Sequence, residues 1–181
     1  IAIWNPCSRT DSAGARWTEG MPAASDCEAS TGSPASRPSS CPIVDAGMHH
    51  QVCVALMGLP FRDDSVHTAA FYIGIIEKLL DRGIHMDSVC MKDASGTTDP
   101  RTCYETAKGL RKILPPEEIL WQHTHDTASM AVACYMAAIE GGADGVDCSV
   151  RPMASGTVQP DVRSVAHALK GTGYSLDINV D

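Results

Sequence analysis

The chain has 181 residues, of which 22 are acidic and 14 are basic, so its formal net charge is −8. This acidic balance argues against a general binder of nucleic acid or of an anionic membrane surface, because both need clustered Lys and Arg. With 44% hydrophobic residues, the chain can form one domain with its own core. No stretch approaches the roughly 20 apolar residues of a membrane span, so we expect no membrane insertion.

Both ends of the sequence are unusual for a complete reading frame. The chain opens Ile1-Ala2-Ile3-Trp4, without an initiator Met or the basic start of a signal peptide, and it stops abruptly at Asp181. We therefore expect both ends to be cuts in a longer open reading frame.

Residues 1–42 differ in composition from the rest. Between Trp4 and Pro42 there is no Ile, Leu, Val or Phe, and Ser, Ala, Pro and Gly dominate. Such a segment cannot bury enough apolar surface to offset the entropy of ordering it. We expect residues 1–42 to be disordered or irregular, or to come from a non-native frame, and residues 43–181 to form the folded domain.

The eight cysteines include no C-x-x-C pair, which argues against a zinc ribbon or a thioredoxin-type motif. Cys53, Cys90 and Cys148 lie in apolar runs, where a reduced cysteine packs as a small hydrophobic residue. We therefore expect reduced core thiols and a cytoplasmic protein.

From Ile43 onward, short apolar runs alternate with amphipathic stretches. Asp99-Pro100 is typical of a helix start, and Gly83 and Gly171 fit helix ends. The predicted elements, in chain order, are a strand at 51–57, a helix at 64–82, a strand at 88–93, a helix at 99–114, a strand at 119–125, a helix at 129–141, a strand at 145–150 and a helix at 161–170.

Four successive strand-then-helix units predict an α/β domain with a parallel sheet and right-handed crossovers. An open doubly wound sheet and half of a (β/α)8 barrel both fit, since a complete barrel needs about 250 residues. No G-x-G-x-x-G follows the first strand, so a dinucleotide-binding fold has little support. Polar residues gather where the strands end, at 92–93, 123–126 and Arg151, which is the catalytic face of a barrel and also the ligand-binding edge of an open sheet. We expect Trp121 to pack against the helices.

His123 and His125 carry the strongest local signal. Side chains alternate along a strand, so both imidazoles point to one face while Thr124 points away. Two imidazoles at this spacing form half of a metal site. The alternative is a pair of hydrogen-bonded interior histidines.

Lys92 ends an apolar strand and precedes Asp93. A lysine in a barrel mouth is costly unless it is paired or chemically altered. The options are a salt bridge to Asp93 or another acid, a contact with a phosphate or carboxylate, and carbamylation by CO2, which would make it an anionic oxygen ligand.

Four segments in order, 91–96, 123–127, 142–147 and 153–160, resemble the carboxyltransferase domain shared by pyruvate carboxylase, the oxaloacetate decarboxylase α subunit and the transcarboxylase 5S subunit. The resemblance covers roughly residues 45–181. It implies the C-terminal half of a TIM (β/α)8 barrel, strands five to eight.

The resemblance also implies roles. A carbamylated Lys92, His123 and His125 would bind a catalytic divalent metal, usually zinc, with manganese or cobalt in some members. The fourth ligand in the family is an Asp in a D-x-x-x-R-D-x-x-Q segment, and this sequence has no such segment. The implied reaction moves CO2 between carboxybiotin and pyruvate or oxaloacetate through a metal-stabilised enolate, with biotin on the carboxyl carrier of another domain or subunit and an oligomeric parent protein.

Four further residues are candidates for contacts around these ligands. Asp93 could pair with Lys92, and Asp126 could orient a histidine or serve as a surface or cap residue. Arg151 could touch an anionic substrate or pair with Asp147 or Asp126, and Gln159 could act in catalysis or structure its loop.

Two alternative functions stay open. One is another metal-dependent aldol-type lyase of the same barrel superfamily, such as a relative of hydroxymethylglutaryl-CoA lyase or isopropylmalate synthase, which also carries an H-x-H pair. The other is a catalytically inactive truncated fragment. Lys92 favours the biotin-dependent branch, to which the resemblance restricts the metal-binding lysine.

Overall fold

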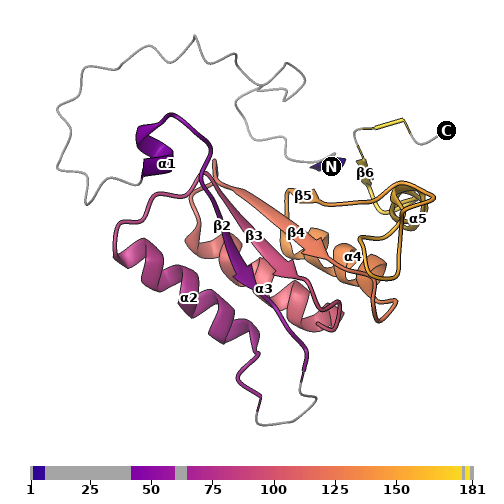
Figure 1. Cartoon of the computed structure of the whole chain (residues 1–181), viewed down its shortest axis with the longest axis horizontal. Helices are drawn as coiled ribbons and strands as arrows, with labels where there is room; N and C mark the ends of the chain where they lie inside the picture. The colour runs from indigo at the N-terminus through magenta and orange to yellow at the C-terminus, as the bar shows by residue number, and fades with distance from the viewer. Residues whose placement is uncertain (1, 7–41, 60–64, 177, 180–181) are drawn as a thin grey trace.

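The computed structural model in Figure 1 describes residues 2–6, 42–59, 65–176 and 178–179. Its elements, in chain order, are β1 (Ala2–Pro6), α1 (Pro42–Asp45), β2 (Gln51–Ala55), α2 (Ala69–Asp81), β3 (Ser88–Asp93), α3 (Pro100–Ile113), β4 (Ile119–Thr124), α4 (Ala131–Gly141), β5 (Gly145–Val146), α5 (Val162–Ala168) and β6 (Tyr174–Leu176). No helix in these ranges is long and apolar enough to cross a membrane.

The sheet has the strand order β2-β3-β4-β5-β1-β6. Strands β2 to β5 pair in parallel, and a helix follows each of them. The α/β fold with four βα units is therefore confirmed. The register aligns Ala55 with Lys92, and Lys92 with His123, so three neighbouring strands end at the same edge.

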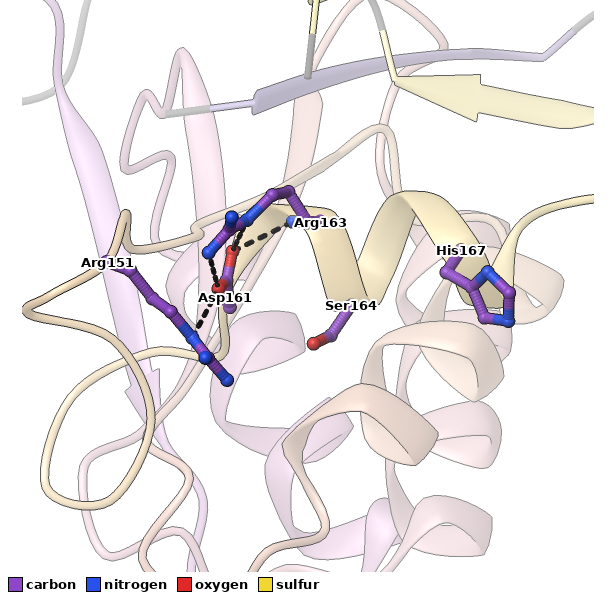
Figure 2. A pocket seen from close by; sticks show the side chains of 5 residues that line it. All are labelled: Arg151, Asp161, Arg163, Ser164 and His167. Atoms are coloured by element: carbon purple, nitrogen blue, oxygen red, sulfur yellow. Dashed lines mark hydrogen bonds and ion pairs between the residues drawn. The ribbon is translucent and has the colours of Figure 1, made fainter. Parts of the chain in front are cut away.

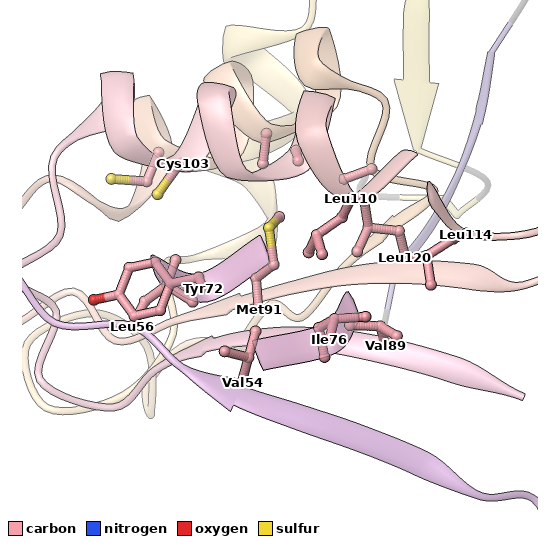
Figure 3. Packing of buried hydrophobic residues seen from close by; sticks show 14 of the residues in the cluster. Val54, Leu56, Tyr72, Ile76, Val89, Met91, Cys103, Leu110, Leu114 and Leu120 are labelled. Atoms are coloured by element: carbon pink, nitrogen blue, oxygen red, sulfur yellow. The ribbon is translucent and has the colours of Figure 1, made fainter. Parts of the chain in front are cut away.

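Helices α2, α3 and α4 all lie on one side of the parallel strands (Figure 1). The strand residues that face them alternate with those that do not, as the pleat requires. Met91 and Leu120 pack with Tyr72, Ile76 and Leu110 of the helices in the main core (Figure 3). Each fully buried side chain of this size stabilises the fold by about 1.5–3 kcal/mol.

The opposite face of the sheet carries Cys90, Lys92, Trp121 and His123. Trp121 therefore does not pack against the helices, contrary to expectation, because Leu120 beside it takes that position. Its ring instead covers Gly145 on the next strand, where a Cβ would lie 2.4 Å from the indole. Among these residues the side chain of Lys92 is exposed, and we call this the open face.

Two further expectations differ from the structure. Strand β1 lies in the segment expected to be irregular, where Ala2 and Ile3 pair with β5 in antiparallel register. Residues 7–41 lie outside the described residues, so the division at residue 42 stays a prediction. The strand expected at 145–150 ends at Val146. Beyond it, the backbone N–H of Asp147 still donates to the carbonyl of Gln122 at 3.2 Å, and Ser149 forms a single bridge with Asp161.

Local signals explain most helix boundaries. The carboxylate of Asp99 caps α3 by accepting the backbone N–H of Thr102 at 3.0 Å, and Pro100 occupies the first turn. The hydroxyl of Thr68 caps α2, so this helix begins at Ala69 rather than near residue 64. Residues 60–64 of that expectation lie outside the described part of the chain.

Candidate metal centre

Lys92 and His123 are adjacent at the carboxyl ends of β3 and β4. They are register partners, and both face away from the helices. His125 follows the end of β4, and its ring centroid lies 5.4 Å from that of His123. The structure thus brings together the three residues for which the sequence suggested a metal role.

Both ring nitrogens of His123 have a hydrogen-bond partner. Nδ1 lies 2.7 Å from Oδ2 of Asp147, and Nε2 lies 3.0 Å from Nε2 of Gln159. The hydroxyl of Ser149 donates to Oε1 of Gln159 at 3.2 Å, which turns the amide N–H groups toward His123. His123 therefore donates from Nδ1 and keeps the lone pair on Nε2, the tautomer of a histidine that binds a metal through Nε2.

Tyr135 of α4 connects the ends of β4 and β5 behind this site. Its buried hydroxyl accepts the backbone N–H of Thr124 at 3.1 Å and lies within hydrogen-bond distance of the carbonyl oxygens of Thr124 and Asp147. Burial raises the pKa of the Tyr135 phenol, so it stays a neutral donor and acceptor. This contact fixes the backbone of Asp147 relative to the strand that carries His123.

Asp93 does not pair with Lys92, because consecutive strand residues point to opposite faces. Its buried carboxylate accepts the backbone N–H groups of Ser95 at 3.0 Å, Gly96 at 2.8 Å and Thr98 at 2.8 Å. Asp93 therefore shapes the loop after β3. Within the described ranges, Lys92 is exposed and has no carboxylate at ion-pair distance.

Asp126 caps the turn before α4 rather than orienting a histidine. Its Oδ1 accepts the N–H of Ala131 at 3.2 Å, and its own N–H donates to the carbonyl of Val158 at 2.8 Å.

The side chain that contacts His123 is Asp147, for which the sequence analysis suggested no such role. Because Trp121 pairs with Gly145, continuing that register brings His123 opposite Asp147, and this was the available signal.

Arg151 pairs with neither Asp147 nor Asp126. Its Nε lies 3.0 Å from Oδ2 of Asp161, which also binds Arg163 at 2.7 Å (Figure 2). The hydrogen bond from Arg163 and the charges of both guanidinium groups lower the pKa of Asp161 to about 2. A shallow hollow surrounds this cluster and shares no residue with the histidine site; its lining residues are Arg151, Asp161, Arg163, Ser164 and His167.

The residues fit part of a metal site. The two imidazoles would supply nitrogen ligands, and Lys92 would supply an oxygen ligand only after carbamylation. Among the residues that the structure describes, no three His, Cys, Asp or Glu side chains are grouped to hold an ion. A carbamylated Lys92 would have to join the two imidazoles to give a third donor for a divalent cation.

The sequence model of the HMGL-like family matches residues 57–181, a range that includes Lys92, His123 and His125. The chain belongs to the HMGL-like family. It is 40% identical over 116 residues to a pyruvate carboxylase subunit of Methanocaldococcus jannaschii, and the match covers 64% of this chain and 20% of that protein. It is 31% identical over 136 residues to the methylmalonyl-CoA carboxyltransferase 5S subunit of Propionibacterium freudenreichii subsp. shermanii, covering 75% of this chain and 26% of that one.

The fold of this chain also matches solved structures of carboxyl transferase domains. The carboxyl transferase domain of Rhizobium etli pyruvate carboxylase, solved with pyruvate and biocytin, matches with a TM-score of 0.63 and 25% identity over 72% of this chain and 22% of that one. The resemblance to carboxyltransferase domains and the partial TIM barrel are thereby confirmed. The chain spans about a fifth to a quarter of the length of the curated relatives named above.

Proposed function

We propose that this chain supplies the metal-binding strand ends of a biotin-dependent carboxyltransferase, which moves CO2 between carboxybiotin and pyruvate or oxaloacetate. The observation that carries the proposal is the register pair Lys92–His123 on the open face, with the His125 ring 5.4 Å from that of His123. All three residues lie in the part of the chain that matches the family. The relatives are pyruvate carboxylases and a carboxyltransferase by name.

Lys92 would act as a carbamate. The ammonium first loses one proton to solvent, and the neutral amine then attacks the carbon of CO2. An N–C bond forms as one C=O π bond opens, and a second proton leaves to solvent, so the cation becomes an anionic oxygen ligand. Its exposure and its lack of a carboxylate partner within the described ranges leave the amine accessible for this step. Two neutral imidazoles and one anionic oxygen suit zinc, and manganese or cobalt also accept such ligands.

The bound metal would supply Lewis acidity beside the pyruvate oxygen, which stabilises the enolate by several kcal/mol. Residues of this chain would orient the ligands for that metal. Asp147 holds the proton of His123 on Nδ1, so Nε2 keeps its lone pair, which accepts the Gln159 amide in this structure. Biotin would arrive on a carboxyl carrier belonging to another domain or subunit, in an oligomeric enzyme.

A second candidate is a metal-dependent aldol-type lyase of the same family, supported by the HMGL-like match and the H-x-H pair. Lys92 separates the two candidates, because only the carboxyltransferase proposal gives it a covalent role. A third possibility is that the chain is inactive by itself, since it spans 20–26% of the relatives named above.

Activity tests the proposal in the protein that carries this chain. Oxaloacetate decarboxylation is measured with free biotin as the CO2 acceptor, for wild type, Lys92→Ala and the exposed helix control Lys78→Ala. We expect Lys92→Ala to lose about 100-fold or more, because several kcal/mol of stabilisation depend on the metal and about 1.4 kcal/mol corresponds to tenfold. Equal activity of the two variants would contradict the carbamate role, and aldol-type cleavage of a hydroxymethylglutaryl thioester without biotin would favour the lyase.

A further inference from the structure

The ring of His123 lies within hydrogen-bond distance of two polar side chains, one at each ring nitrogen. Asp147 binds Nδ1 at 2.7 Å, and Gln159 binds Nε2 at 3.0 Å. We propose that Asp147 positions His123 for a cation, whereas the Gln159 amide competes with the cation for Nε2. This inference rests on the proposed metal role of His123 and adds two positioning residues with effects of opposite sign.

The position of Asp147 is fixed independently of His123. The Tyr135 hydroxyl contacts its carbonyl oxygen, and its backbone N–H donates to the carbonyl of Gln122 at 3.2 Å. The side chains of His123 and Asp147 are 19% and 29% exposed, so the contact is only partly screened by solvent. A carboxylate held in this way keeps the proton on Nδ1 and makes Nε2 a better electron donor.

Gln159 is oriented by its own neighbours. Its Oε1 accepts the Ser149 hydroxyl at 3.2 Å, and its carbonyl accepts the N–H of Ser155 at 2.8 Å. The amide nitrogen therefore donates into the single lone pair of His123 Nε2. A cation at that nitrogen must displace the amide, so cation binding is coupled to the side chain of Gln159 and to its loop, residues 153–160.

Removing each partner should therefore shift the affinity for a cation in opposite directions. Asp147→Ala should weaken binding by about 10- to 100-fold, as is typical when the partner of a metal-binding histidine is lost. Gln159→Ala should tighten it by about 3- to 10-fold, the equivalent of one ordinary hydrogen bond. Asp147→Asn retains an acceptor oxygen without the charge and should fall between wild type and Asp147→Ala.

The test titrates Co2+ against a competing chelator in the protein that carries this chain. It compares wild type, the three variants and Glu140→Gln, which removes a carboxylate from the exposed side of α4. Circular dichroism establishes that each variant is folded. An unchanged affinity in Asp147→Ala, or a weaker one in Gln159→Ala, would overturn the proposal.

A second readout requires no metal and separates this inference from the proposed function. Nitrogen-15 NMR of the His123 ring reports its tautomer in metal-free protein. We expect a protonated Nδ1 in wild type and loss of this preference in Asp147→Ala. A wild-type ring protonated on Nε2 would overturn the inference even if the metal binds, whereas absence of metal binding with a protonated Nδ1 would count only against the proposed function.

Discussion

The backbone of Gly96 packs closely against the carbonyl oxygen of His125. Its φ is +67°, and a Cβ built on it would lie 2.4 Å from that oxygen. The backbone N–H of His125 in turn donates to the carbonyl of Asp93 at 2.9 Å. The loop after β3 is thus packed directly on the segment that carries the second histidine, which explains the glycine in the Lys92-Asp93-x-x-Gly96 pattern.

Replacing this glycine should destabilise the fold and disturb the site. Gly96→Ala places an alanine in the left-handed backbone conformation, which costs about 1–3 kcal/mol. Its Cβ would also clash with the backbone of His125. Gly47→Ala is the control, since Gly47 has φ +68° with nothing within 4 Å of its Cβ position. Urea unfolding should show a larger loss for Gly96→Ala, and equal losses would contradict the close packing on His125.

The cysteines should differ sharply in reactivity. Cys53 is exposed, while Cys90, Cys103 and Cys134 are buried, and all four are free thiols. Burial raises the pKa of the partly buried Cys148 to about 12, which suppresses its thiolate. Among the cysteines that the structure describes, peptide mapping after brief iodoacetamide treatment should find Cys53 labelled first and the three buried thiols labelled only in urea. Early labelling of Cys103 or Cys134 would contradict the core packing.

Asp161 should contribute stability that disappears in acid. Its pKa is lowered from 3.8 to about 2 by Arg163 and Arg151, so the folded state favours the ionised carboxylate. Such a contribution is complete above the unfolded pKa and is lost as pH falls from about 4 through 2. Melting temperatures of wild type and Asp161→Asn should differ at pH 6 and converge near pH 2; a constant difference would exclude this linkage.

Local patterns in the sequence predicted much of the fold. Helical spacing, the Asp99 cap and apolar runs identified four strands and four helices, because those signals lie within single segments. The pairing of β1 with β5 and the early end of β5 depend on contacts between distant segments, which composition does not record.

The residues of the candidate site could also be predicted only where the signal lies within one segment. Alternation along one strand places His123 and His125 on one face. The same alternation excludes a salt bridge between the consecutive residues Lys92 and Asp93, which was one of the options left open for Lys92. The partner of His123 is Asp147, 24 residues away on another strand. Finding it requires the register between β4 and β5 as well as the pattern within each strand.

The central claim is that Lys92 and His123 bind one divalent ion together. Metal analysis by mass spectrometry, on the protein that carries this chain and purified with bicarbonate, tests it most directly. We expect about one ion per chain in wild type and in Lys78→Ala, and a loss of most metal in both Lys92→Ala and His123→Ala. Full metal retention in Lys92→Ala or His123→Ala, or a metal-free wild type, would contradict the account.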